Sequence, residues 1–163
     1  FAMIKSIKLL SFLSLVFLFN ACSMQQGGGL KDMVAVVQMK DAVPGVCNLN
    51  YVLSIMPFEG NGQEEAVAPK TDAEIEEMLN TQVDFLKGKS NYDDEGMVGI
   101  IVNCKGKMVS CKIDNETQSP ELDEQIVAVF KTFKNWKAGT IHGKAIDTMV
   151  LYSFKIKDGR ISL

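Results

Sequence analysis

The segment formed by residues 97–161 constrains the fold more than any other part of this 163-residue chain. Two β-prone runs, at 99–103 and 108–113, flank the short turn Lys105-Gly106-Lys107. Runs of this kind on either side of a Gly-containing turn are typical of a β-hairpin. We therefore expect this segment to open with two antiparallel strands.

A helix and a third strand are predicted to follow the hairpin. Ser119 is a favourable N-cap residue and Pro120 a favourable first helical residue. Apolar residues then recur at spacings of three and four, which indicates one buried helix face: Leu122, Ile126, Val129, Phe130 and Phe133. The β-rich run 146–156 closes the segment, so the predicted order is β-β-α-β.

A second helix is predicted before the hairpin. Thr71 and Glu74 have the spacing of a capping box, in which each side chain binds a backbone amide of the other residue. Gly88 is expected to end this helix, whose predicted buried face is Ile75, Met78, Leu79, Val83 and Leu86. The sequence therefore predicts an α+β fold, a small antiparallel sheet with two helices packed on one face.

Residues 32–70 are predicted to form a β-rich extension followed by a loop. The runs 34–38 and 48–56 are β-prone and are separated by the turn residues Pro44-Gly45. Alternation in the second run predicts a strand whose buried side chains are Leu49, Tyr51, Leu53 and Ile55. The two strands could extend the main sheet or form a hairpin beside it, and 58–70 is expected to be a connector.

Several residues of the β-β-α-β segment resemble the TonB C-terminal domain, in the variant common in Bacteroidetes-type bacteria. The resemblance is carried by Gly99 in the first strand, Leu122-Asp123 at the helix start, Trp136 followed by Gly139, and Gly143 before the last strand. The turn Val-Asn-Cys-Lys-Gly at 102–106 and the ending Phe-Lys-Ile-Lys-Asp-Gly at 154–159 belong to the same pattern. It covers about 65 residues, or about 90 with the preceding helix.

This resemblance implies a protein that binds other proteins rather than an enzyme. TonB C-terminal domains bind a short extended peptide of an outer-membrane transporter by strand addition, in the periplasm, and pass on force. We do not expect energy transduction itself here, because the sequence shows no spanning helix and its four prolines are not clustered. The candidate partner-binding residues lie on the predicted last strand, which we expect to be a sheet edge: Ile146, Thr148, Val150, Leu151, Tyr152 and Phe154.

The first 21 residues are typical of a bacterial signal peptide. Lys5 and Lys8 precede an apolar run at 9–19 that is too short to span a bilayer, and Ala21-Cys22 resembles a lipobox. Cys22 is therefore the predicted lipidation site; an ordinary signal peptide with an incidental cysteine is the alternative. The predicted organisation is a signal peptide (1–21), a lipidated tether (22–31), the β-rich extension and loop (32–70), and a TonB C-terminal-like domain (71–163).

The predicted localisation is the cell envelope, facing the periplasm, with the outer membrane favoured over the inner. The expected partners are an envelope protein or peptide, for example an outer-membrane transporter, and the membrane itself through the lipid. The alternative is a structural lipoprotein that self-associates as a homodimer through the same edge. The net charge of −3, with lysines scattered among acids, argues against a nucleic-acid partner.

Catalytic and metal chemistry find little support in the sequence. His142 is the only histidine, and no nucleophile motif, zinc-ligand spacing or phosphate-binding loop accompanies it, so we predict no cofactor and no metal. Cys47, Cys104 and Cys111 are candidate disulfide partners in an oxidising compartment. A Cys104–Cys111 bridge would be strained within one hairpin, which leaves Cys47 paired with either one, or free thiols. A small thiol- or ligand-binding protein is the weakest hypothesis.

Overall fold

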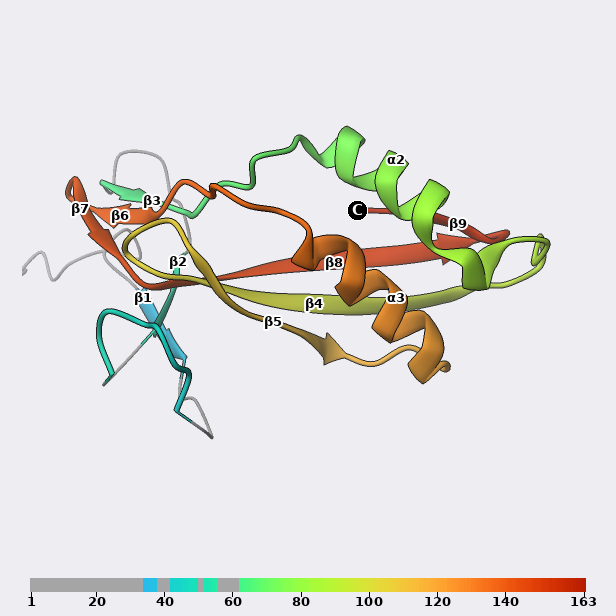
Figure 1. Cartoon of the computed structure of the whole chain (residues 1–163), viewed down its shortest axis with the longest axis horizontal. Coiled ribbons are helices and arrows are strands. Elements are labelled where there is room, and N and C mark those ends of the chain that lie inside the picture. The colour runs from blue at the N-terminus through green and yellow to red at the C-terminus, as the bar shows by residue number, and fades with distance from the viewer. Residues whose placement is uncertain (1–33, 38–41, 50–51, 56–61) are drawn as a thin grey trace, which may run out of the picture. The chain divides into compact units, whose positions relative to one another are not determined.

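The computed structural model describes residues 34–37, 42–49, 52–55 and 62–163 (Figure 1). All of them belong to one compact unit, residues 33–163. The prediction for Cys22, the signal peptide and the tether lies outside the described residues. None of the helices that the structure describes is long and apolar enough to cross a membrane.

The predicted hairpin is present and forms one side of the main sheet. Strands β4 (Asp94–Val102) and β5 (Met108–Asn115) pair antiparallel, and β4 begins five residues before the predicted start at Gly99. Strand β8 (Thr148–Lys157) pairs antiparallel with the other edge of β4, over the whole length of β4. Figure 1 shows these three long strands side by side beneath the helices.

Two further strands extend the main sheet. One of their pairings is parallel, so the prediction of a purely antiparallel sheet was wrong. β1 (Val34–Val37) pairs antiparallel with β2 (Val52–Ile55), and β2 pairs parallel with the start of β8. The order of the sheet is β1-β2-β8-β4-β5. The extension therefore forms a strand pair of its own and also joins the sheet, which combines the two arrangements left open by the sequence.

The C-terminal strand differs from its prediction. The run 146–156 is divided, because Ile146 ends β7 (Lys144–Ile146) and Asp147 separates it from β8. A final strand, β9 (Arg160–Ser162), folds back on the end of β8 through Asp158-Gly159. Both turn residues have positive φ, 50° and 73°, as a tight two-residue hairpin requires. A second small sheet contains β3 (Gln63–Glu64), β6 (Gly139–Ile141) and β7.

Both predicted helices form and begin where the sequence indicates. α2 (Asp72–Gln82) has the full Thr71–Glu74 capping box, and a short 3₁₀ turn, η3 (Asp84–Leu86), follows it before Gly88. α3 (Pro120–Lys131) begins after Ser119, but Ser119 makes no side-chain cap bond. The buried Asp123 carboxylate instead accepts hydrogen bonds from the Thr117 N–H (3.1 Å) and hydroxyl (2.8 Å).

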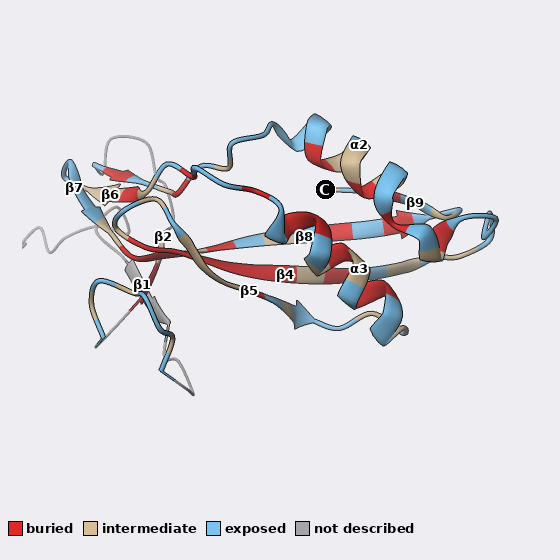
Figure 2. Cartoon of the chain, viewed as in Figure 1, coloured by how far each residue is buried: buried red, intermediate tan, exposed pale blue. Residues whose placement is uncertain are grey.

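The core lies between the helices and one face of the sheet, as Figure 2 shows in red. Even-numbered residues of β4 and β8 point into it because side chains alternate along a strand. The largest fully buried side chains include Ile75, Leu79, Leu122, Ile126, Phe130, Val98, Ile100 and Phe154. The predicted alternation in the second run is correct at Leu53, which is buried, but wrong at Leu49, which is 79 % exposed, and at Val52, which is 0 % exposed.

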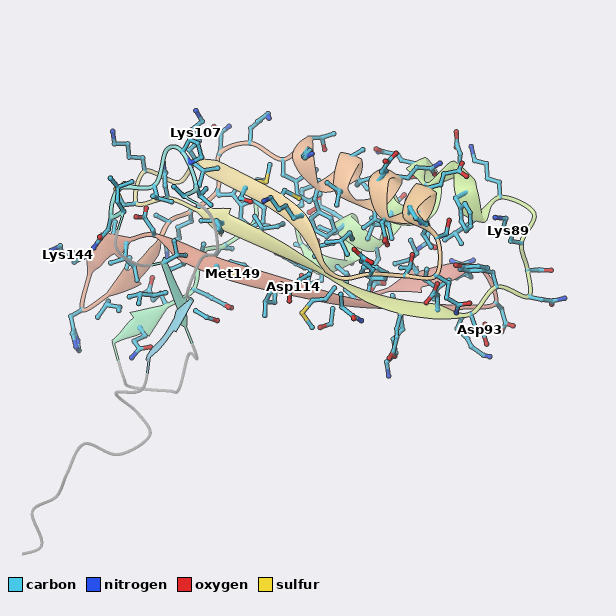
Figure 3. All side chains as sticks on the ribbon, turned by 90° about the horizontal axis from the view of Figure 1, so that it is seen from below. Lys89, Asp93, Lys107, Asp114, Lys144 and Met149 are labelled. Atoms are coloured by element: carbon cyan, nitrogen blue, oxygen red, sulfur yellow. A yellow bond between two sulfur atoms is a disulfide. The ribbon has the colours of Figure 1, made fainter. Side chains whose placement is uncertain are left out.

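The long strands have two distinct ends. Figure 3 shows Lys107 and Lys144 at one end and Lys89 and Asp93 at the other. Met149 and Asp114 lie between them, and a Cβ on Gly99 would sit 2.7 Å from Met149 Cε. The absence of a side chain at Gly99 therefore leaves room for the Met149 side chain on this face of the sheet.

Candidate functional site

One stretch of β8 has no strand partner on its outer edge among the described residues. β4 occupies the inner edge of β8, so β2 and β9 must both lie on the outer edge. β2 pairs with Thr148 and Met149, and β9 pairs with residues 155–157. Residues 150–154 remain between them, and we call this stretch the β8 window.

Backbone groups of two residues face outward in the β8 window. The Leu53 N–H donates to the Asp147 carbonyl (3.1 Å), so odd-numbered residues of this region direct their N–H and C=O groups toward the outer edge. Within the β8 window these are Leu151 and Ser153. Their two N–H and two C=O groups could make up to four hydrogen bonds with an added strand.

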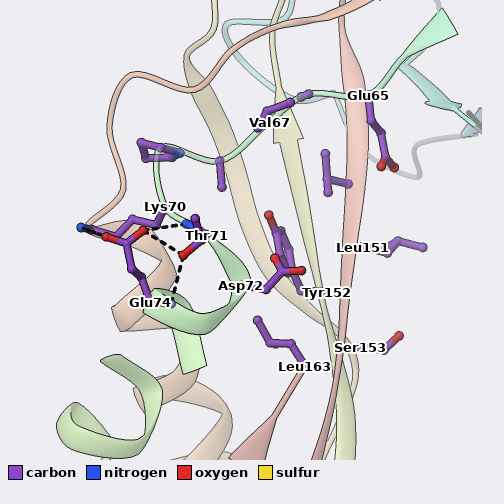
Figure 4. Close-up of a pocket in the computed structure, with 14 residues that line it drawn as sticks. Glu65, Val67, Lys70, Thr71, Asp72, Glu74, Leu151, Tyr152, Ser153 and Leu163 are labelled. Carbon is purple, nitrogen blue, oxygen red and sulfur yellow. Dashed lines mark hydrogen bonds and ion pairs between the residues drawn. The ribbon is translucent and has the colours of Figure 1, made fainter. Parts of the chain in front are cut away.

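A groove of about 720 Å³ borders the β8 window (Figure 4). Its walls are residues 65–72 and Glu74 on one side and residues 150–153 on the other, and Leu163 also lines it. Two backbone hydrogen bonds between Val67 and Lys137, of 3.0 and 2.9 Å, hold the first wall in place. The groove thus runs beside an unpaired strand edge and has a fixed opposite wall.

The groove carries unbalanced negative charge. Lys70 forms an ion pair with Glu74 at 3.3 Å, whereas Glu65 and Asp72 have no hydrogen bond or ion pair within the described part of the chain. Burial raises the pKa of Glu65. Burial also raises the pKa of Tyr152 to about 12, and the charges of Asp72 and Glu65 add to that effect.

The six predicted partner-binding residues are not equivalent in the structure. Thr148, Val150 and Phe154 are buried, and Ile146 belongs to β7 in the second sheet. Only Leu151, which is 44 % exposed, and the half-buried Tyr152 line the groove with accessible surface. The predicted last strand, 146–156, is thus an open sheet edge only over residues 150–154, because β2 and β9 pair with β8 on either side of that stretch.

Sequence reasoning missed two parts of the groove and the strand that ends the β8 window. Ser153 was not singled out, although its backbone faces the β8 window. Residues 65–70 were expected to be part of a connector, and they form a wall of the groove. The Asp158-Gly159 pair is a hairpin signal that could have revealed β9 and the covered end of β8.

A disulfide joins Cys47 to Cys104, one of the pairings that the sequence left open. Asp147 lies beside it and accepts hydrogen bonds from the backbone N–H groups of Asn48 (2.7 Å) and Cys104 (2.9 Å). These three side chains place ligand atoms within 4.8 Å of one another, but the two sulfur atoms are bonded to each other and hold no metal in that state. Cys111 is a free, buried thiol whose pKa burial raises to about 11, which makes it unreactive at neutral pH.

Comparison with protein-family models, with curated proteins and with solved structures found no match to this chain.

Proposed function

We propose that this protein is a lipid-anchored interaction module of the cell envelope that holds an extended peptide by adding it to β8. The observation that carries the proposal is the β8 window, an unpaired strand stretch beside a groove. Strand addition uses the backbone for affinity and the flanking groove for selection of side chains. The TonB-like order of elements and the lipobox-like Cys22 support the same assignment.

The geometry of the β8 window favours a free peptide over a second copy of this chain. β2 and β9 project outward by about one strand spacing, roughly 4.8 Å, on either side of the window. Two recessed windows could not meet edge to edge without collision of these strands. The self-associating structural lipoprotein, the alternative from the sequence, therefore has less support.

The length of the β8 window sets the size of the bound segment. Met149 and Lys155, the paired residues that border the β8 window, are six positions apart, which corresponds to about 20 Å in an extended strand. A peptide of four or five residues would fill this distance. A transport-related envelope protein with a short extended segment fits this requirement, and no energy transduction by this chain is proposed.

Site-specific photo-crosslinking in cells tests this proposal. A photoreactive residue at Leu151 would lie beside an added peptide. The matched control is Lys112, which is exposed on β5, two strands away from β8 in the main sheet. We expect Leu151 to give a discrete adduct with one short segment of another envelope protein, and Lys112 to give none. Equal adducts from both positions, or adducts only between copies of this chain, would overturn the proposal.

A further inference from the structure

We propose that the peptide bound in the β8 window carries a lysine or arginine at the residue opposite Tyr152, held by Glu65 and Asp72. This inference rests on the proposed function, and it adds the chemistry of the partner. It concerns Glu65 and Asp72, the two groove carboxylates other than Glu74, which strand addition alone does not require.

The side-chain alternation of β8 determines which residue of a bound peptide enters the groove. Tyr152 points to the helix side of the sheet, where its ring lies 5.1 Å from that of Phe130 and 6.4 Å from that of Trp136, centroid to centroid. Residues directly opposite each other on neighbouring strands point to the same face. The peptide residue opposite Tyr152 therefore directs its side chain toward residues 65–72, and its two neighbours point to the other face.

The charges around that position favour a cation. Figure 4 shows the Asp72, Glu65 and Tyr152 side chains among those that line the groove. The nearest cation of the groove wall, Lys70, is already engaged by Glu74 at 3.3 Å, so it does not offset the other two carboxylates. Glu65, Asp72 and Tyr152 all line the same groove.

The partly buried Glu65 gives the preference its selectivity. Its burial already disfavours the carboxylate form, so an acidic peptide residue would add repulsion and a neutral one would leave the charge uncompensated. A basic side chain instead supplies an opposite charge where water is partly excluded. Discrimination between partners then comes from repulsion as well as from attraction.

A panel of defined peptides tests the inference on the full-length protein. The probes are fluorescein-labelled five-residue peptides of alternating Val and Thr, with Lys, Gln or Glu at the central position. Affinities are measured by fluorescence polarisation at low and high salt, with wild type, the Glu65→Gln/Asp72→Asn double variant, and Glu77→Gln as a control. Glu77 is exposed on α2 and does not line the groove.

We expect the Lys peptide to bind about tenfold more tightly than the Gln peptide, and the Glu peptide to bind most weakly. This ratio should fall to about one in the double variant, persist in Glu77→Gln, and shrink at high salt. Equal affinities for the Lys and Gln peptides in wild type, or an unchanged ratio in the double variant, would overturn the inference.

Ser153→Pro separates this inference from the proposed function. Proline removes the N–H that faces the β8 window, so all three peptides should bind more weakly, whereas Ser153→Ala keeps that N–H and should bind as wild type. A drop in Ser153→Pro without a Lys preference in wild type would retain strand addition and reject the basic residue. Circular dichroism checks that Ser153→Pro is folded. Failure of every peptide to bind wild type at millimolar concentration would contradict both proposals.

Discussion

Removal of the Cys47–Cys104 disulfide should cost this protein a large part of its stability. The bond joins residues 57 positions apart, and the closed loop includes β2, α2 and β4. In the chain-entropy model, cross-linking a loop of that length lowers the entropy of the unfolded chain by about 14 cal/mol/K, or about 4 kcal/mol at 25 °C. Cys47 is exposed and Cys104 half-buried, so the substitutions should remove little packing.

Urea denaturation of a Cys47→Ala/Cys104→Ala variant measures this loss. With a denaturant slope of about 2 kcal/mol/M, the unfolding midpoint should fall by about 2 M relative to the oxidised wild type. Wild type treated with dithiothreitol should behave like the variant, and dithiothreitol should leave the variant unchanged. A loss below about 1 kcal/mol would refute the reasoning, because the bond would then not constrain the unfolded chain.

Three further predictions concern the fold. Gly106→Ala should lower the free energy of unfolding by about 2–3 kcal/mol, because φ is +71° and the new Cβ would lie 2.3 Å from the Trp136 carbonyl oxygen. Gly143→Ala has φ +77° but open space around the Cβ, so it should cost only about 1 kcal/mol in the same urea assay. Cys111, whose pKa is raised to about 11, should resist iodoacetamide at pH 8 until urea unfolds the protein, as peptide mass spectrometry would show; rapid native labelling would contradict its burial. Thr71→Ala should cost about 1 kcal/mol of unfolding free energy, whereas Ser119→Ala, which loses no cap bond, should change it by a few tenths; equal losses would contradict the capping assignment.

Local signals in the sequence were sufficient for the central elements of the fold. The hairpin around Gly106, the capping box at Thr71 and the proline at the start of α3 each depend on residues a few positions apart, and all three features are present. The α+β class follows from the same elements. Their boundaries were less accurate, since β4 begins at Asp94 rather than Gly99.

Strand pairings and contacts between residues far apart in the chain could not be predicted from local sequence signals. The parallel pairing of β2 with β8 joins residues almost 100 positions apart, and nothing near Leu53 or Thr148 specifies it. The groove wall at 65–72 is set by backbone bonds to Lys137, which a sequence of polar and small residues does not reveal. The predicted alternation was wrong at Leu49 and Val52 for a related reason, because tertiary neighbours decide which residues of this run are buried.

Residue-resolved amide hydrogen exchange tests the central claim most directly, since it reports whether the outer edge of β8 is unpaired. The N–H groups of Val150 and Tyr152 pair with β4, so they should exchange slowly. Those of Leu151 and Ser153 face the β8 window and should exchange at least about a hundredfold faster in the unbound protein. A bound peptide should then slow these two amides selectively. Uniformly slow exchange from Val150 to Ser153 in the unbound protein would contradict the account, because the edge proposed for peptide binding would already be paired.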